Sequence, residues 1–254
     1  MARRSFRAQL PLAPRTERYF RWRGHQLSRL EGLSDAVFGF ALTLLIVSTE
    51  VPRDYAGLIQ VIQGFPAFVA CFAILMMFWN EHYRFFRRYG LEDRTTRILN
   101  YGILLLVLFS VYPLKFLFSS WLSSLFGPSA GGATFTALTQ LQTVYRIYGF
   151  GLAGIWLLYA LLQGHALRLS AQLKLTPNEV VLTRLELCSH LINISVCLGS
   201  VLLSYLPVHP WIPGLIYAGL GPLLAINGIW HGSKVREPSP HGQTPSAHDR
   251  RSRP

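Results

Sequence analysis

The chain contains about six apolar stretches, each close to the roughly 20 residues that an α-helix needs to cross the hydrocarbon core of a bilayer. Hydrocarbon offers the backbone no hydrogen-bond partners, so such segments are expected to be helices rather than loops or open sheet. Only 14% of the residues are charged, whereas a soluble domain carries about 25%. The sequence therefore predicts an all-α membrane protein with six transmembrane helices, approximately at 33–48, 61–79, 98–118, 144–162, 185–206 and 211–230.

The basic residues indicate how these helices are oriented. Lys and Arg gather before the first stretch, between the second and third, between the fourth and fifth, and after the sixth, while Arg53 is the only basic residue of the other connections. Cytoplasmic segments carry the excess of positive charge, so both termini are predicted to be cytoplasmic. The net charge of +12 is then explained by topology and by attraction to anionic lipid headgroups. Nucleic-acid binding is not expected.

Three regions follow from this pattern. Residues 1–28 form a basic cytoplasmic arm, residues 29–232 the six-helix domain, and residues 233–254 a tail rich in Pro, Ser, Gly and His that is expected to be disordered. The three cysteines lie within apolar stretches and are expected to be buried free thiols. Glu186 and His190, one helical turn apart, can hydrogen-bond to each other, which favours a helix-packing device over a proton relay. The histidines of the loops, helix ends and tail show no metal-ligand spacing, and no metal site is predicted.

The first apolar stretch begins with charged residues, Arg29, Glu31 and Asp35. A charge near hydrocarbon costs several kcal/mol unless it has a partner, so such residues are candidates for a functional or structural role. Arg29 either pairs with an acid such as Glu31, which is the favoured role, or extends its side chain into the lipid headgroups. Asp35 needs donors from neighbouring helices, and the predicted topology places three polar side chains at its membrane level, those of Trp79, His82 and Asn100.

A helical projection divides this first helix into faces. Phe40, Leu44 and Val47 form one apolar stripe with Thr43 at its edge, whereas Asp35 points away from it. An apolar stripe at helical spacing is common in helix packing and does not by itself indicate a pore. The Thr43 hydroxyl has two readings: it supplies oxygen atoms to an ion, or it bonds to its own helix one turn back.

At this point the residues resemble the transmembrane protein 175 family, potassium channels with animal members in endosomes and lysosomes and prokaryotic members that are single six-helix subunits. Its RxxxFSD signature resembles Arg29, Leu33, Ser34 and Asp35 here, with Leu33 in place of the signature phenylalanine. The resemblance covers all six helices in layout but is specific only over the first three. It extends to "AVFGFALTLLIV" and "FWNEHYRFFR", with Trp79 and His82, and to Asn100 and Pro113.

The resemblance implies a homotetramer in which the first helix of each subunit lines a central pore with an apolar constriction. It places Phe40, Leu44 and Val47 at the constriction and Thr43 at a position that influences selectivity. It also implies potassium as the permeant ion, membrane lipids as further partners, no cofactor, and a multi-pass location in the cell membrane. The remaining matching residues are expected to form a structural network: Arg29, Leu33, Ser34, Asp35, Trp79, His82 and Asn100.

The sequence thus predicts a potassium-selective leak-type channel, and two alternatives stay open. A non-conducting scaffold of the same fold would use the stripe as a subunit interface. An intramembrane enzyme would use the cluster of Ser34, Asp35, His82 and Asn100, but the cluster has no second acid on another helix at matching depth. The chain is therefore not expected to be an enzyme.

Overall fold

The computed structural model describes residues 20–24, 26–47, 51–126, 138–207, 209 and 212–235. The predicted arm before residue 20 and the predicted tail from residue 236 onward lie outside the described residues. The helices are α1 (Arg29–Val47), α2 (Tyr55–Gln63), α3 (Phe65–Tyr89), α4 (Arg94–Phe126), α5 (Leu138–Arg168), α6 (Pro177–Leu203), α7 (Ile212–Leu215), the short 3-10 helix η4 (Ile216–Gly219) and α8 (Leu220–Gly232).

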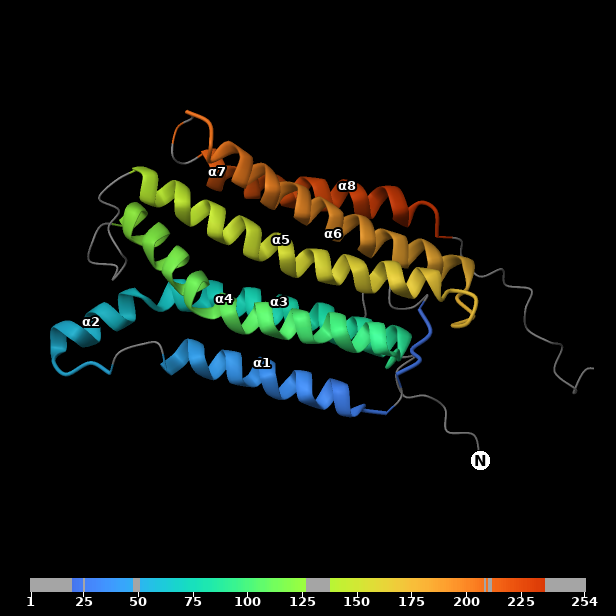
Figure 1. The fold of residues 1–254 in the computed structure, drawn as a ribbon. Helices are drawn as coiled ribbons and strands as arrows, with labels where there is room; N and C mark the ends of the chain where they lie inside the picture. Colours follow the sequence, from blue (N-terminus) through green and yellow to red (C-terminus); the bar gives the residue numbers. More distant parts are fainter. Residues whose placement is uncertain are drawn as a thin grey trace, which may run out of the picture.

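Within the described residues, six helical segments are long and apolar enough to cross a membrane, as predicted: α1, α3, most of α4, α5, α6 and the unit from α7 to α8. They form an elongated bundle with α1 along one edge, where it packs against α3 and α4 (Figure 1). α5 lies between α4 and α6, and α8 packs against α6 at the opposite edge. This arrangement leaves one side of α1 uncovered by the other described helices.

The second predicted helix differs from the structure at both ends. α2 ends at Gln63, Gly64 caps it, and α3 starts afresh with Pro66 in its first turn. Proline suits a first turn because its missing N–H needs no partner there. α3 then continues to Tyr89 instead of ending near Trp79. The basic residues from 84 to 88, predicted to lie in a connection, are therefore part of this helix.

Pro113 bends α4. A proline inside a helix removes a backbone hydrogen bond and clashes with the carbonyl one turn earlier, and Figure 1 shows α4 changing direction along its length. The Pro113 carbonyl accepts a hydrogen bond from the Tyr148 hydroxyl of α5. The bend is thus fixed against the neighbouring helix, and α4 runs on to Phe126 rather than ending at Phe118.

Residues Phe20–Gly24, here called the N-terminal strap, pack across the bundle end where α3 finishes and α6 begins. Arg23 Nη2 lies 2.8 Å from Glu179 Oε2, and the Arg23 N–H donates to the Arg87 carbonyl at 3.1 Å. The Phe20 ring meets the Tyr89 ring edge-on, with 5.5 Å between centroids. This last part of the predicted arm is therefore docked on the helical domain.

Asp93 links the start of α4 to the end of α5. Its carboxylate accepts hydrogen bonds from the Thr95 N–H at 3.1 Å and the Thr96 hydroxyl at 2.5 Å, and lies 3.0 Å from His165 Nε2. Burial acts to raise the pKa of Asp93, but these hydrogen bonds and the charge of His165 outweigh it, and the pKa is lowered. The ionised form is therefore the one that the fold stabilises.

We expect Asp93→Asn to lower the free energy of unfolding at neutral pH by less than about 1 kcal/mol, because the carboxylate is partly exposed and screened. The variant should therefore melt at a slightly lower temperature than the wild type. A lowered folded-state pKa gives stability that is present above the unfolded value of 3.8 and is lost as the pH falls through the folded value. Thermal melting from pH 7 down to pH 3 should show the difference shrinking in acid. A difference independent of pH would contradict this role of the charge.

α5 packs so closely on α6 at Gly149 that a larger residue does not fit there. A Cβ at Gly149 would lie 2.3 Å from Val201 Cγ2 and 3.1 Å from the Cys197 carbonyl oxygen, whereas a Cβ at Gly151 would meet no atom within 4 Å. Gly149→Ala should destabilise the protein by about 1–3 kcal/mol through overpacking. Gly151→Ala should be neutral or stabilising by up to about 1 kcal/mol. Melting of both variants in detergent checks this, and equal melting temperatures would contradict it.

Candidate functional site on α1

One face of α1 holds the helix against the bundle. Apart from Glu31, the buried residues of α1 follow the three-and-four spacing of a helical face that packs against α3 and α4: Leu30, Ser34, Phe38, Ala41 and Leu45. Ser28 precedes the helix, and its Oγ accepts the Glu31 N–H at 3.0 Å, as an N-terminal cap does. The start and the inner face of α1 are thereby fixed.

A buried polar chain crosses three helices beside this face. The Asn100 amide of α4 donates from Nδ2 to Ser34 Oγ at 2.9 Å, and Ser34 donates to the Leu30 carbonyl at 2.8 Å. The Asn100 Oδ1 lies 2.9 Å from His82 Nε2 of α3, and since this oxygen can only accept, His82 Nε2 carries the hydrogen. Each of these polar groups has its partner within the bundle, so α1, α3 and α4 are joined at one level.

Asp35 takes a different partner. Trp79 Nε1 donates to Asp35 Oδ1 at 2.8 Å, and the Trp79 ring stacks on Tyr83 with 5.4 Å between centroids. Of the three donors expected for Asp35, the structure gives it Trp79, while Asn100 donates to Ser34 and His82 bonds to Asn100. The two polar residues at the end of the signature therefore have separate partners: Ser34 belongs to the buried polar chain, and Asp35 pairs with Trp79 nearer the surface.

Two signature residues lie outside this network in the single chain. Arg29 is exposed and makes no ion pair with any residue that the structure describes, and Leu33 is exposed as well. The pairing of Arg29 with Glu31 is therefore absent from the described contacts. Glu31 is itself buried, and its Oε2 atom has no hydrogen-bond partner among the described residues.

Most of the predicted stripe lies on the side of α1 that no other described helix covers. Phe40 is 60% exposed and Val47 69% exposed, while Thr43 is exposed and Leu44 is half-buried against the core. The Thr43 hydroxyl donates to the Gly39 carbonyl at 3.0 Å, the bond to its own helix that was one of the two readings. This face has no chemistry for bond-making, but it can contact lipid or further copies of the chain.

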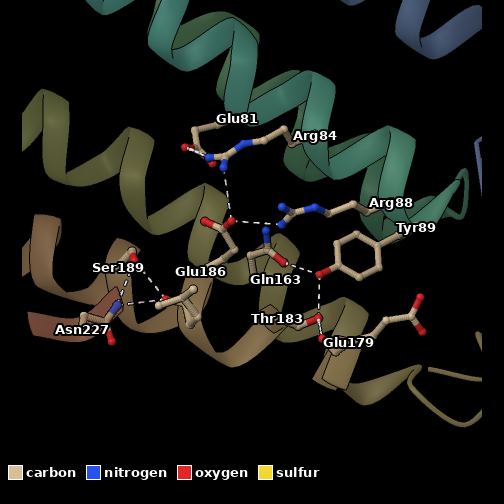
Figure 2. A network of polar contacts seen from close by, with 11 residues as sticks. Glu81, Arg84, Arg88, Tyr89, Gln163, Glu179, Thr183, Glu186, Ser189 and Asn227 are labelled. Carbon is tan, nitrogen blue, oxygen red and sulfur yellow. Dashed lines mark hydrogen bonds and ion pairs between the residues drawn. The ribbon is translucent and has the colours of Figure 1, made fainter. Parts of the chain in front are cut away.

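Sequence reasoning missed a second polar network, which lies between α3, α5, α6 and α8 (Figure 2). Arg88 Nη1 of α3 lies 3.0 Å from Glu186 Oε1 of α6. The Tyr89 hydroxyl lies 2.7 Å from Thr183 Oγ1 and 3.0 Å from Gln163 Oε1. The available signal was the helical spacing of Arg84 and Arg88, which topology alone explained as loop charge.

Comparison with known proteins gives this geometry a family. The sequence model of the family described as the endosomal/lysosomal potassium channel TMEM175 matches residues 29–113, which run from the start of α1 to Pro113 of α4. A potassium channel of Marivirga tractuosa is 32% identical over 232 residues, 85% of this chain and 92% of that protein. The chain belongs to the TMEM175 family.

Further TMEM175 relatives agree. A potassium channel of Chamaesiphon minutus is 29% identical over 96 residues, which are 35% of this chain and 47% of that protein. The crystal structure of the potassium channel MtTMEM175, as a variant bound to a nanobody–MBP fusion, matches with a TM-score of 0.74 and 29% identity over 88% of this chain and 100% of that one. A TMEM175 homolog from Chamaesiphon minutus, described as a lysosomal potassium-selective channel, shares the fold with a TM-score of 0.51 and 21% identity over 80% of this chain and 96% of that one.

Membership of the TMEM175 family decides one alternative. The family and these relatives are channels and not enzymes, so the prediction that the chain is not an enzyme is confirmed. The chemistry of Ser34, His82 and Asn100 is thus that of hydrogen bonds between helices rather than of a catalytic cluster.

The buried chain can be tested by its energetic coupling. Asn100→Ala and His82→Ala should each destabilise the protein by about 1–3 kcal/mol, because each leaves buried polar groups unpaired. The double variant should lose less than the sum, with a coupling of at least about 0.5 kcal/mol. Tyr101→Phe, at the exposed neighbouring position of α4, is the control and should melt like the wild type. Additive losses in the cycle would show that the two side chains act independently.

Proposed function

We propose that the chain is one subunit of a homotetrameric, potassium-selective channel of the leak type, located in the cell membrane, with α1 lining the pore. The observation that carries the proposal is the exposed face of α1, which bears Phe40, Thr43 and Val47 in a chain that belongs to the TMEM175 family. The relative from Marivirga tractuosa, matched over most of both chains, is a potassium channel. The distribution of basic residues supports cytoplasmic termini.

Four copies of α1 around an axis would cover this face. The inner face is already satisfied by α3 and α4, so the uncovered side is the one available for the axis. Phe40, Leu44 and Val47 would then form successive apolar rings along the pore. A narrow apolar ring expels water, so an ion passes when the ring widens or when the ion keeps enough of its hydration shell. Potassium sheds hydration more readily than sodium, which favours modest potassium selectivity.

The Thr43 hydroxyl can bond to its own helix and still supply an oxygen atom to an ion. Its hydrogen is donated to the Gly39 carbonyl, and this leaves the oxygen lone pairs as the groups that an ion could meet. A ring of four such oxygens between the levels of Phe40 and Leu44 would compensate part of the hydration that potassium loses. The bond to the helix fixes the hydroxyl rather than excluding it from the pore.

The buried chain of Ser34, Asn100 and His82 has a mechanical role in this proposal. It joins α1 to α3 and α4 at the end of α1 that precedes the apolar rings. Ring diameter depends on how each α1 is held, so a rigid anchor at this end limits the constriction to a narrow range. The Asp35 bond to Trp79 adds a second point of attachment to α3.

Phe40 supports the alternative of a non-conducting scaffold of the same fold. A ring of four phenylalanines is bulkier than rings of isoleucine or leucine, and it could close the axis while the rest of the fold is retained. In that case the stripe is a subunit interface, and the flux of either ion through the wild type is absent.

Potassium flux into liposomes containing the purified protein tests the proposal, with sodium measured in parallel and empty liposomes as the background. We expect potassium flux to exceed sodium flux, and we expect Phe40→Ala and Leu44→Ala to raise flux severalfold and reduce selectivity. Phe150→Ala is the matched control, since it makes the same substitution at a similarly exposed position of α5. Wild-type flux and selectivity in both stripe variants would rule out α1 as the pore lining, and a folded tetramer without flux would favour the scaffold.

A further inference from the structure

A group of three potential metal ligands lies between α3 and α6, away from α1. Glu186 and His190 stand one turn apart on α6, and Glu81 faces them from α3. One ligand atom from each lies within 4.8 Å of the other two. The spacing of two ligands at i and i+4 on one helix face is a common arrangement in metal sites. Here a third ligand is supplied by a helix that is distant in sequence.

His190 is the unexplained member of this group. Its side chain is buried, at 2% exposure, and neither ring nitrogen has a hydrogen-bond partner among the described residues. The hydrogen bond between His190 and Glu186 that their spacing allows is therefore absent from the described contacts. A buried imidazole costs free energy when its nitrogens are unpaired. The ring is nevertheless held in place, since it stacks on Trp156 with 5.4 Å between centroids and 25° between planes.

The two carboxylates of this group can bind a cation only if the Arg84 guanidinium moves away from them. Glu186 Oε1 lies 3.0 Å from Arg88 Nη1 and 3.3 Å from Arg84 Nη1, and Arg84 also pairs with Glu81 (Figure 2). The Arg88 side chain is only 4% exposed, whereas that of Arg84 is 27% exposed. Arg84 can therefore withdraw toward the surface, while Arg88 stays as the buried partner of Glu186. A cation and the Arg84 guanidinium would compete for the same two carboxylates.

We propose that Glu81, Glu186 and His190 form a binding site for a divalent metal ion, with Zn²⁺ as the best fit, and that the ion displaces Arg84. One imidazole nitrogen and two carboxylate oxygens are a ligand set that zinc accepts, with water at the fourth position. Zinc bonds of about 2.0–2.2 Å place ligand atoms about 3.5 Å apart, so the three side chains need to draw together by roughly 1 Å. The bound ion would clamp α3 to α6.

Metal titration of the purified full-length protein in detergent tests the site without any ion gradient. We expect saturable binding of Zn²⁺ by calorimetry, a rise in melting temperature with Zn²⁺, and visible absorption bands when Co²⁺ replaces it. His190→Gln and Glu186→Gln should weaken binding by at least about tenfold and remove the Co²⁺ bands. Arg84→Gln should strengthen binding, because it removes the competing charge. His165→Gln, a matched change at the same bundle end, should bind as the wild type does.

Three results would overturn the proposal: no saturable binding by the folded wild type, binding by folded His190→Gln equal to that of the wild type, or weaker binding by Arg84→Gln. If His190→Gln does not fold, Glu81→Gln takes its place as the ligand variant, and Arg84→Gln still gives an opposite sign that a general loss of structure cannot produce. Because the proposed pore lies on α1, its failure in flux assays leaves these outcomes unchanged.

Discussion

A polar side chain in the interior of a membrane bundle has to find its hydrogen-bond partner within the protein, because the surrounding hydrocarbon offers none. The bonds that meet this demand here join different helices. Asn100 of α4 bonds to Ser34 of α1 and lies beside His82 of α3, and Arg88 of α3 is paired with Glu186 of α6. Apolar packing alone tolerates sliding of one helix past another, whereas each of these contacts breaks when the helices shift by one turn. The register of the bundle therefore depends on a small number of buried polar contacts.

The same demand explains why the two faces of α1 differ in polarity and burial. Its inner face carries Ser34 with all partners supplied by its own chain, and its outer face carries Phe40 and Val47 with few intrachain contacts. A helix that is fully anchored on one side and uncovered on the other presents a preformed surface, and little further ordering is needed when that surface meets another copy. In the proposed tetramer, the pore wall is thus formed by residues of α1 that the described part of the subunit leaves exposed.

The sequence predicted the helices because length and apolar content are local properties, and the six spans needed no knowledge of contacts. The sequence-based prediction was wrong at helix ends where charged residues are paired with residues distant in the sequence. α3 was expected to stop near Trp79 since the following residues include several arginines, yet Arg88 finds Glu186 at a separation of 98 residues. The contact between Phe20 and Tyr89 could not be predicted either, because these residues are also distant in the sequence. At the candidate site, the predicted membrane level offered Asp35 three donors, and the structure pairs it with Trp79. Which donor bonds to which acceptor depends on side-chain directions that spacing does not determine.

α3 connects the two polar regions of the molecule through adjacent residues. His82 faces α1 and α4 while Glu81 faces α6, because successive residues on a helix point about 100° apart. Glu81 and Glu186 are balanced by Arg84 and Arg88, which allows four charges to be buried between helices without a net charge. A cation that enters this group has to displace one arginine, so its affinity is set by the difference between two ion pairings rather than by the ligands alone. The turn of α3 that would respond to such an exchange is also the turn that holds α1 through Asn100, so the anchoring of α1 and the α3–α6 charge cluster share one rigid element.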